Sequence, residues 1–212
     1  MTADDELMVT SAEGVLSLVL NRPEKRNALS ASLRWRLVDV LAAGAADDTV
    51  GAVLLSGAGG YFCAGFDLAE LAAAPDPAAV FADAATYHET VHGFAKPLVA
   101  ALEGPVVAGG LDLALMSDIR IASTQATFGQ PQVKRGIPAS FDLVASIVGQ
   151  AAASELCLTG RVVDAAEALR MGLVHHVVEP AEVMARAATV ARGIADHGSG
   201  AIVKQQILDT RA

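Results

Sequence analysis

Twice in the sequence, a short apolar run leads directly into a glycine-bearing loop and then into a segment of helical character. The first loop, residues 61–68 (YFCAGFDL), follows the apolar run at 50–55. The second, residues 103–113 (EGPVVAGGLDL), follows the run at 97–102. A strand that turns through glycine into a helix leaves backbone N–H groups pointing outward at the start of the helix. This feature favours a fold in which strands and helices alternate.

Two such turns side by side could aim two N–H donors at one point, which is the arrangement of an oxyanion hole. Asp112 lies three residues into the second predicted helix, between Leu111 and Leu113. A carboxylate among leucines is costly to bury without a partner or a purpose. The helix dipole also favours an acid in the first turn, which is a purely structural explanation. We expect Asp112 to transfer a proton next to a carbonyl group.

The wider pattern predicts an α/β fold with parallel pairing, because strands and helices alternate with loops of only a few residues. Ser30 is placed to cap one helix, and Asp164 with Glu167 has the spacing of a capping box for another, which Gly172 ends. Further apolar runs predict strands at 15–20, 119–122 and 174–178. The remaining helices are expected at 67–74, 78–94, 109–116, 150–158, 179–197 and 201–210. One more helix is expected after Pro138, ending at about position 148.

Four sequence blocks resemble the crotonase superfamily, also called the enoyl-CoA hydratases/isomerases. The first block is residues 20–29 (LNRPEKRNAL), and the two glycine-bearing loops form the second. The third is residues 128–133 (FGQPQV), and the fourth is residues 158–161 (LTGR) with the helix that follows. Each block alone is a weak signal, whereas four blocks in the family's order over residues 15–178 are a specific one.

The resemblance implies a crotonase-like spiral of repeated ββα units, followed by C-terminal helices that mediate trimers. We expect residues 1–178 to form the spiral core and residues 179–212 a shortened C-terminal helical segment. Lys204 resembles a lysine that lies early in the C-terminal helices of the family. Because members usually extend several tens of residues beyond the position of Ala212, we expect a more open acyl pocket.

By resemblance, the ligand is an acyl-CoA thioester, and the activity is that of a lyase or isomerase of the enoyl-CoA hydratase/isomerase type. The carbonyl oxygen of the thioester would accept hydrogen bonds from the backbone amides of Phe66 and Gly109. No cofactor is implied, since coenzyme A is part of the substrate. The residues that match the walls of the CoA site are Arg26, Ala28, Ala64, Asp67, Leu68, Ala108 and Pro131.

The chain departs from the family at one catalytic position. Hydratases of the family flank the substrate with two glutamates, and these positions hold Asp112 and Gln132 here. Glutamine can hold water or a substrate oxygen, but it does not take up a proton at working pH. Asp112 alone could support isomerisation, decarboxylation, thioester hydrolysis or slow hydration. Asp142 is a candidate replacement acid. The alternative is a catalytically weak CoA-binding or scaffold subunit.

Composition restricts the partners of the protein. The formal net charge is −9, which argues against nucleic-acid binding because that function needs a basic face. The acidic balance also means that a CoA ligand must rely on local donors such as Lys25 and Arg26. No apolar run approaches the ~20 residues of a membrane helix, and the N-terminus does not resemble a secretory signal. We expect a cytoplasmic protein, without nucleic-acid or membrane partners, that forms a homo-oligomer.

Two further motifs suggest other chemistry. Residues 88–92 (HETVH) match the H-E-x-x-H pattern of zinc peptidases, with His88 and His92 as the ligands. A catalytic zinc site needs a third protein ligand, and none follows at a suitable spacing, so we expect no metal. Cys63 lies in the first loop, but a reactive thiol needs a cationic environment, which its sequence neighbours do not supply.

Overall fold

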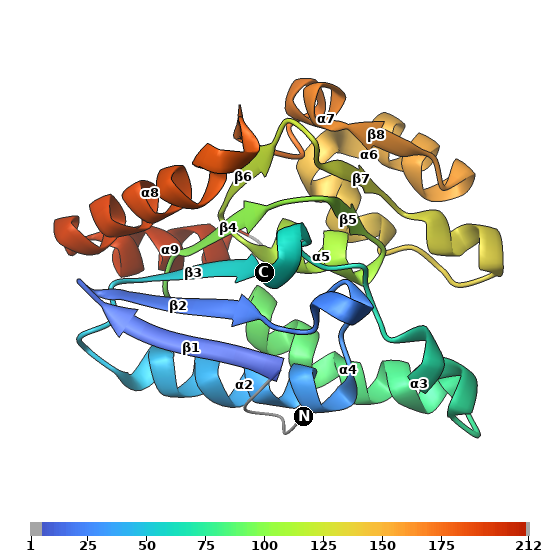
Figure 1. Ribbon diagram of the computed structural model, residues 1–212, viewed down its shortest axis with the longest axis horizontal. Helices are drawn as coiled ribbons and strands as arrows, with labels where there is room; N and C mark the ends of the chain where they lie inside the picture. The colour runs from blue at the N-terminus through green and yellow to red at the C-terminus, as the bar shows by residue number, and fades with distance from the viewer. Residues whose placement is uncertain (1–5, 211–212) are drawn as a thin grey trace.

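The computed structural model describes residues 6–210, apart from the side chains of residues 77–79, 81 and 83. Its described strands form two sheets (Figure 1). The larger sheet has the strand order β1-β2-β3-β4-β6-β9, and the smaller has the order β5-β7-β8. The strands are β1 (Leu7–Ala12), β2 (Val15–Leu20), β3 (Ala52–Gly57), β4 (Leu98–Leu102), β5 (Pro105–Val107), β6 (Ile119–Ser123), β7 (Thr127–Gly129), β8 (Val162–Asp164) and β9 (His176–Val178).

Helices connect the strands and cover both faces of the larger sheet. The α-helices are α2 (Ala31–Ala46), α3 (Leu68–Ala73), α4 (Pro77–His92), α5 (Gly109–Met116), α6 (Phe141–Thr159), α7 (Ala165–Met171), α8 (Val183–His197) and α9 (Gly200–Asp209). Short 3-10 helices lie at Pro23–Lys25, Ala58–Gly60, Pro131–Arg135 and Pro180–Glu182. In Figure 1, α2 and α4 lie on one side of the larger sheet, and α8 lies on the other.

The two faces of the larger sheet bury alternate side chains, as the period of a strand requires. Val53 and Leu55 of β3 join the core cluster that contains Leu37 of α2. Leu54, the residue between them, joins the opposite cluster with Ala187 of α8. Because both faces are covered, the strand is a continuous apolar run in the sequence. The predicted strands in this sheet were therefore found within a few residues of their true bounds.

The chain steps repeatedly from the larger sheet to the smaller one and then into a helix. β4 is followed at once by β5 and then α5, and β6 is followed by β7 and then α6. Each step is one ββα unit, so the spiral that the resemblance implied is confirmed. The prediction of parallel pairing is right for β2, β3, β4, β6 and β9, and for β5 with β7.

Two strand pairs are antiparallel, and the prediction of parallel pairing did not include them. β1 forms a hairpin with β2, and β8 pairs antiparallel with β7. β1 was not predicted because residues 8–12 of that edge strand are all exposed, and no apolar face marks them. The strands of the smaller sheet were also missed, since each is only three residues long.

The helix caps predicted at Ser30, Asp164 and Gly172 are confirmed, whereas the Glu167 carboxylate of the predicted capping box accepts from Arg161. Ser30 Oγ accepts from the Leu33 amide, Asp164 Oδ1 accepts from the Glu167 amide, and Gly172 ends α7 in the left-handed region. The break predicted at position 149 is confirmed, because Gly149, with φ 77° and ψ 161°, separates the two helical segments of α6. In residues 6–210, α6 alone is long and apolar enough to span a membrane. This is weak evidence for a membrane helix, because length and composition alone select it and Gly149 breaks its regular geometry.

Candidate active site

The order of strands in the larger sheet brings the two glycine-bearing loops together. β3 and β4 are parallel neighbours, with Val53 opposite Leu98, so both strands end at the same edge of the sheet. The loop after β3 and the loop after β4 therefore start side by side. A bridge between Cys63 and Val106 continues this pairing. The two loops that the sequence singled out line one wall of a common site.

Close backbone contact between the loops explains the glycines. Gly65 has φ +95°, and a methyl group there would lie 3.1 Å from the amide nitrogen of Gly109. A methyl group on Gly109 would lie 2.8 Å from the ring of Phe66. Ala108, immediately before α5, has a positive φ of 53° and turns the chain so that Gly109 begins the helix. The first amides of a helix have no partner within it, so the Gly109 N–H belongs to a natural anion-binding position.

A cavity of about 380 Å³ lies against both loops. It collects nine of the eleven predicted site residues: Arg26, Ala64, Phe66, Leu68, Ala108, Gly109, Asp112, Pro131 and Gln132. Ala28 and Asp67 are not among its lining residues. The carbonyl of Ala28 and the carboxylate of Asp67 both accept hydrogen bonds from the Arg22 guanidinium. Arg22 thereby joins the loop at 20–29 to the first glycine-bearing loop.

Asp112 is buried in the wall, with only 5% of its surface exposed. Gln130 Nε2 donates to one carboxylate oxygen at 2.8 Å, and Ser140 Oγ donates to the other at 2.7 Å. Burial raises the pKa of Asp112, and it outweighs the two hydrogen bonds and the nearby His88, which act in the opposite direction. A buried carboxyl group of raised pKa in a cavity wall is a suitable proton carrier.

Sequence reasoning missed Gln130 and Ser140 as partners of Asp112. Gln130 lies in the block 128–133 that carried the family resemblance, but nothing in its spacing connects it to a residue 18 positions earlier. Ser140 immediately precedes α6, where it has the position of an ordinary helix cap, although its side chain makes no capping hydrogen bond. The signal for both residues is spatial rather than sequential.

Gln132 lines the same cavity as Asp112. Its Nε2 donates to Gln130 Oε1 at 2.6 Å, so Gln130 stands between Gln132 and the carboxylate. The Oε1 atom of Gln132 is buried and accepts no hydrogen bond within the described chain. The contact of Gln132 with Asp112 is thus indirect.

His88 reaches the site from α4, and its ring centroid lies 6.2 Å from that of Phe66. Burial lowers the pKa of His88, although Asp112 opposes this effect. A second cavity, of about 1060 Å³, lies beyond His88, Asp112 and Ser140 and also reaches His92 and Asp142. Asp112 therefore stands between two cavities, and Asp142 lines only the larger one.

The other chemical candidates find little support. In residues 6–210, no three His, Cys, Asp or Glu side chains are grouped so as to hold a metal ion. The H-E-x-x-H match therefore lacks the third ligand that a catalytic zinc requires. Cys63 is buried, and burial raises its pKa to about 12. A thiol that stays protonated is not a nucleophile, which agrees with the prediction.

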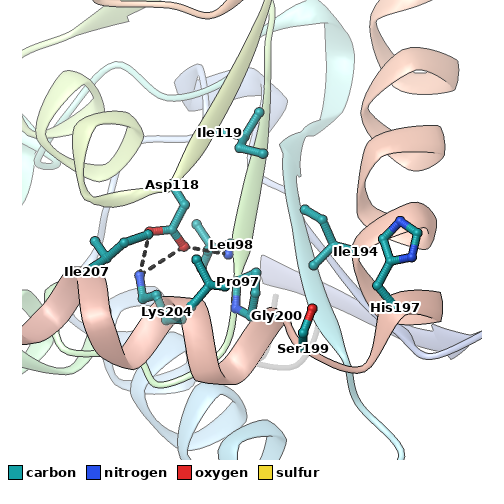
Figure 2. Close-up of a pocket in the computed structure, with 11 residues that line it drawn as sticks. Pro97, Leu98, Asp118, Ile119, Ile194, His197, Ser199, Gly200, Lys204 and Ile207 are labelled. Carbon is teal, nitrogen blue, oxygen red and sulfur yellow. Dashed lines mark hydrogen bonds and ion pairs between the residues drawn. The ribbon is translucent and has the colours of Figure 1, made fainter.

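Lys204 lies away from this site, in a smaller cavity of about 310 Å³ between α8, α9 and the starts of β4 and β6 (Figure 2). Its Nζ atom contacts the two oxygens of Asp118 at 2.7 and 2.9 Å. Asp118 Oδ2 also accepts from the Leu98 amide at 2.9 Å. Lys204 thereby attaches α9 to the larger sheet at the starts of β4 and β6.

The spiral of ββα units is the crotonase fold. The sequence model of the Enoyl-CoA hydratase/isomerase family matches residues 10–208. The chain therefore belongs to the Enoyl-CoA hydratase/isomerase family.

Individual relatives agree with this assignment. A "Probable enoyl-CoA hydratase" of Rhizobium meliloti is 39% identical over 194 residues, which are 90% of this chain and 76% of the relative. A 4-chlorobenzoyl coenzyme A dehalogenase of Arthrobacter is 35% identical over 202 residues, covering 91% of this chain and 73% of the relative. The crystal structure of an enoyl-CoA hydratase/isomerase from Xanthobacter autotrophicus superposes with a TM-score of 0.90 at 34% identity, over 97% of this chain and 81% of that one.

Proposed function

We propose that the protein is an acyl-CoA thioester enzyme of the hydratase/isomerase type in which Asp112 is the only acid/base. The amides of Phe66 and Gly109 would hold the thioester carbonyl oxygen. Enolate-like charge on that oxygen would then be stabilised, and Asp112 would move a proton at the neighbouring carbon. One observation carries the proposal: a buried carboxyl group of raised pKa lines the same cavity as both glycine loops.

The residues that line the cavity and the names of the relatives both support a CoA thioester as the ligand. The named relatives include an enoyl-CoA hydratase and a 4-chlorobenzoyl-CoA dehalogenase, and the chemical group that these names share is a thioester of coenzyme A. Arg26 and Arg135 are exposed and line the cavity, so they are placed to pair with the phosphates of CoA. Such local donors are needed because the chain as a whole carries a net charge of −9.

The reaction would use one carboxylate rather than two. Gln132 cannot accept a proton at working pH, and Asp142 faces the other cavity. Double-bond migration needs one group that removes a proton and returns it, which Asp112 could do alone. Water addition at the same site would be slower, because only one carboxylate would activate the water. The homo-oligomer expected from the resemblance remains a prediction, which light scattering of the purified protein would test.

A second candidate is a CoA-binding subunit with little activity. It is favoured by the amide at position 132, since the second acid of the family's hydratases is replaced there. The two candidates predict the same binding of acyl-CoA and differ in turnover. Both keep the oxyanion loops, so binding alone does not separate them.

The deciding experiment measures binding and turnover of crotonyl-CoA by the wild type and by Asp112→Asn. Binding is followed by calorimetry, and turnover by loss of the conjugated absorbance and by chromatography of the acyl products. We expect binding by both proteins and turnover by the wild type only, reduced at least ~100-fold in Asp112→Asn, since general acid–base catalysis contributes about 10²–10⁴-fold. Binding without turnover in the wild type would favour the binding subunit. No binding would contradict the ligand assignment.

A further inference from the structure

Gln132, Gln130 and Asp112 form a line of hydrogen bonds that leads from the cavity wall into the core. Gln130 is the middle member and is completely buried. Its Nε2 lies 2.8 Å from Asp112 Oδ1, and its Oε1 lies 2.6 Å from Gln132 Nε2. Both ends of the Gln130 amide are therefore committed to side chains of the site.

The line has a direction that the chemistry of its members dictates. An ionised carboxylate only accepts hydrogen bonds, so Gln130 must present its NH₂ group to Asp112. Its carbonyl oxygen then faces Gln132, which must donate a hydrogen bond from its own NH₂ group. The Oε1 atom of Gln132 is left buried without a donor in the described chain, which is a cost. Gln132 is thus oriented to donate to Gln130, and its own Oε1 atom is left without a donor.

We propose that Gln130 and Gln132 form a one-way hydrogen-bond relay that orients the Asp112 carboxylate, so that Gln132 is a positioning residue rather than a group that touches the ligand. Gln132 stops the Gln130 amide from turning over and presenting its oxygen to the carboxylate. The relay rests on the proposed function in one respect, since that function supplies the reaction that Asp112 performs. The hydrogen bonds themselves do not depend on it.

The relay predicts an unexpected result for Gln132→Glu. This change recreates the second glutamate of the family's hydratases, and a two-carboxylate view predicts a gain of hydration. In the relay, an ionised glutamate would place an acceptor against the Gln130 oxygen. Either the new glutamate binds a proton, or Gln130 turns over and its oxygen faces Asp112. A protonated Glu at this position would donate to Gln130 as the amide does and would supply no second base, whereas a turned Gln130 would set its oxygen against Asp112. We therefore expect crotonyl-CoA hydration not to rise, and to fall about tenfold or more where Gln130 turns over.

The test follows the Asp112 carboxyl carbon by ¹³C NMR during a pH titration of the whole protein, assigned by its loss in Asp112→Asn. Gln132→Met removes the amide at similar length, and Gln130→Met removes the direct donor. We expect both variants to shift the Asp112 titration to higher pH, because a donor to the charged form is lost or misdirected. The titratable groups that interact with Asp112 are His88 and Tyr87 of α4, Cys157 of α6 and Cys63. The charged or titratable groups that share its two cavities are Arg26, Arg135, Glu89, His92 and Asp142, and none of either set is changed. Gln125→Met, at an exposed turn, is the matched control and should titrate like the wild type.

Kinetics supply a second readout. A positioning role predicts that Gln132→Met lowers kcat about tenfold with KM within twofold, whereas loss of a ligand contact would raise KM. The relay is overturned if Gln132→Met leaves the Asp112 titration unchanged, or if its only effect is on KM. Should Gln130→Met fail to fold, Gln132→Met decides alone, since Gln132 is only half-buried. If both variants shift the Asp112 titration but the wild type never turns over crotonyl-CoA, the proposed function is refuted and the relay stands.

Discussion

The guanidinium of Arg22 contacts the carboxylate of Asp67 at 2.9 Å, although 45 residues separate them in the chain. Arg22 also contacts Glu6 at 3.0 Å and the carbonyl of Ala28. One largely buried cation thus joins the start of the edge strand β1, the loop at 20–29 and the first glycine-bearing loop. Burial alone would raise the pKa of Asp67, but the hydrogen bonds from Arg22 and the Ala69 amide lower it.

Replacing Arg22 by methionine should therefore destabilise the protein. Breaking a buried ion pair by removing one partner typically costs about 3–5 kcal/mol, and we expect the lower end here, about 3 kcal/mol at neutral pH. Because the folded pKa of Asp67 is lowered, its contribution is present above the unfolded pKa and is lost as the pH falls through the folded value. The loss in Arg22→Met, measured by urea unfolding, should accordingly shrink in acid.

The matched control for Arg22 is Arg192→Met. Arg192 pairs with Glu13 at 3.2 Å, but both side chains are at least half exposed. Exposed pairs contribute about 0–1 kcal/mol, so this variant should unfold nearly like the wild type. Equal losses in the two variants would show that Arg22 acts as surface charge and not as a buried clamp.

Gly109→Ala should damage the site without unfolding the chain. A methyl group at this position would lie 2.8 Å from the Phe66 ring and would separate the two loops. Since both proposed oxyanion donors would move, we expect turnover to fall about 10²–10³-fold, as for the loss of one such donor. Gly193→Ala, in α8 with nothing within 4 Å of the added methyl, is the control and should keep full activity. Normal turnover by Gly109→Ala would contradict the claim that a methyl group at this position separates the two loops.

The sequence predicts best those parts of the fold that local physics determines. The strands of the larger sheet are apolar because both faces are covered, as Leu54 and Leu55 show by facing opposite clusters. Ser30 and Asp164 cap helices through bonds to residues only three positions away. The glycine loops were recognised because the backbone needs glycine at 65 and 109.

The parts that escaped prediction depend on contacts between distant residues. The strands of the smaller sheet are three residues long and are defined by their partners, not by a pattern of their own. Gln130 and Ser140 reach Asp112 from 18 and 28 positions away. Neither has a property in the sequence that distinguishes it from a surface glutamine or a helix cap. Asp112 was found because a carboxylate among leucines is conspicuous without any partner.

Asp112 should reduce the stability of the protein at neutral pH. Burial raises its folded pKa above the unfolded value, so the folded state binds more protons between the two values, and stability falls as the pH rises through that interval. Asp112→Asn removes the titration and can still accept from Gln130. We expect Asp112→Asn to have a higher Tm than the wild type at neutral pH, with the difference vanishing below about pH 4, the ordinary range of an Asp. Calorimetry at several pH values measures this, and a lower Tm for the variant at all pH values would contradict it.

Lys204→Met tests how α9 is attached to the sheet. Lys204 is 1% exposed, and its partner Asp118 is held at the same time by the Leu98 amide (Figure 2). Removing the lysine leaves a nearly buried carboxylate without its cation, which typically costs about 3–5 kcal/mol. We expect the free energy of unfolding in urea to fall by this amount. Relative to the wild type, amide hydrogen exchange should become faster in α9 than in the other helices. The catalytic cavity does not include Lys204, so binding of acyl-CoA by the folded fraction should be unchanged.

A double-mutant cycle with Asp118→Asn separates the ion pair from the packing of the long lysine side chain. The amide that this second substitution introduces keeps an oxygen for the Leu98 N–H but carries no charge to leave unpaired. If the pair carries the stability, the double variant should lose clearly less than the sum of the two single losses. Additive losses would mean that Lys204 acts through its aliphatic stem, which packs beside Pro97 and Ile207 in the small cavity. The salt dependence of unfolding would then be the same in the wild type and in Lys204→Met, because no ion pair would have been lost.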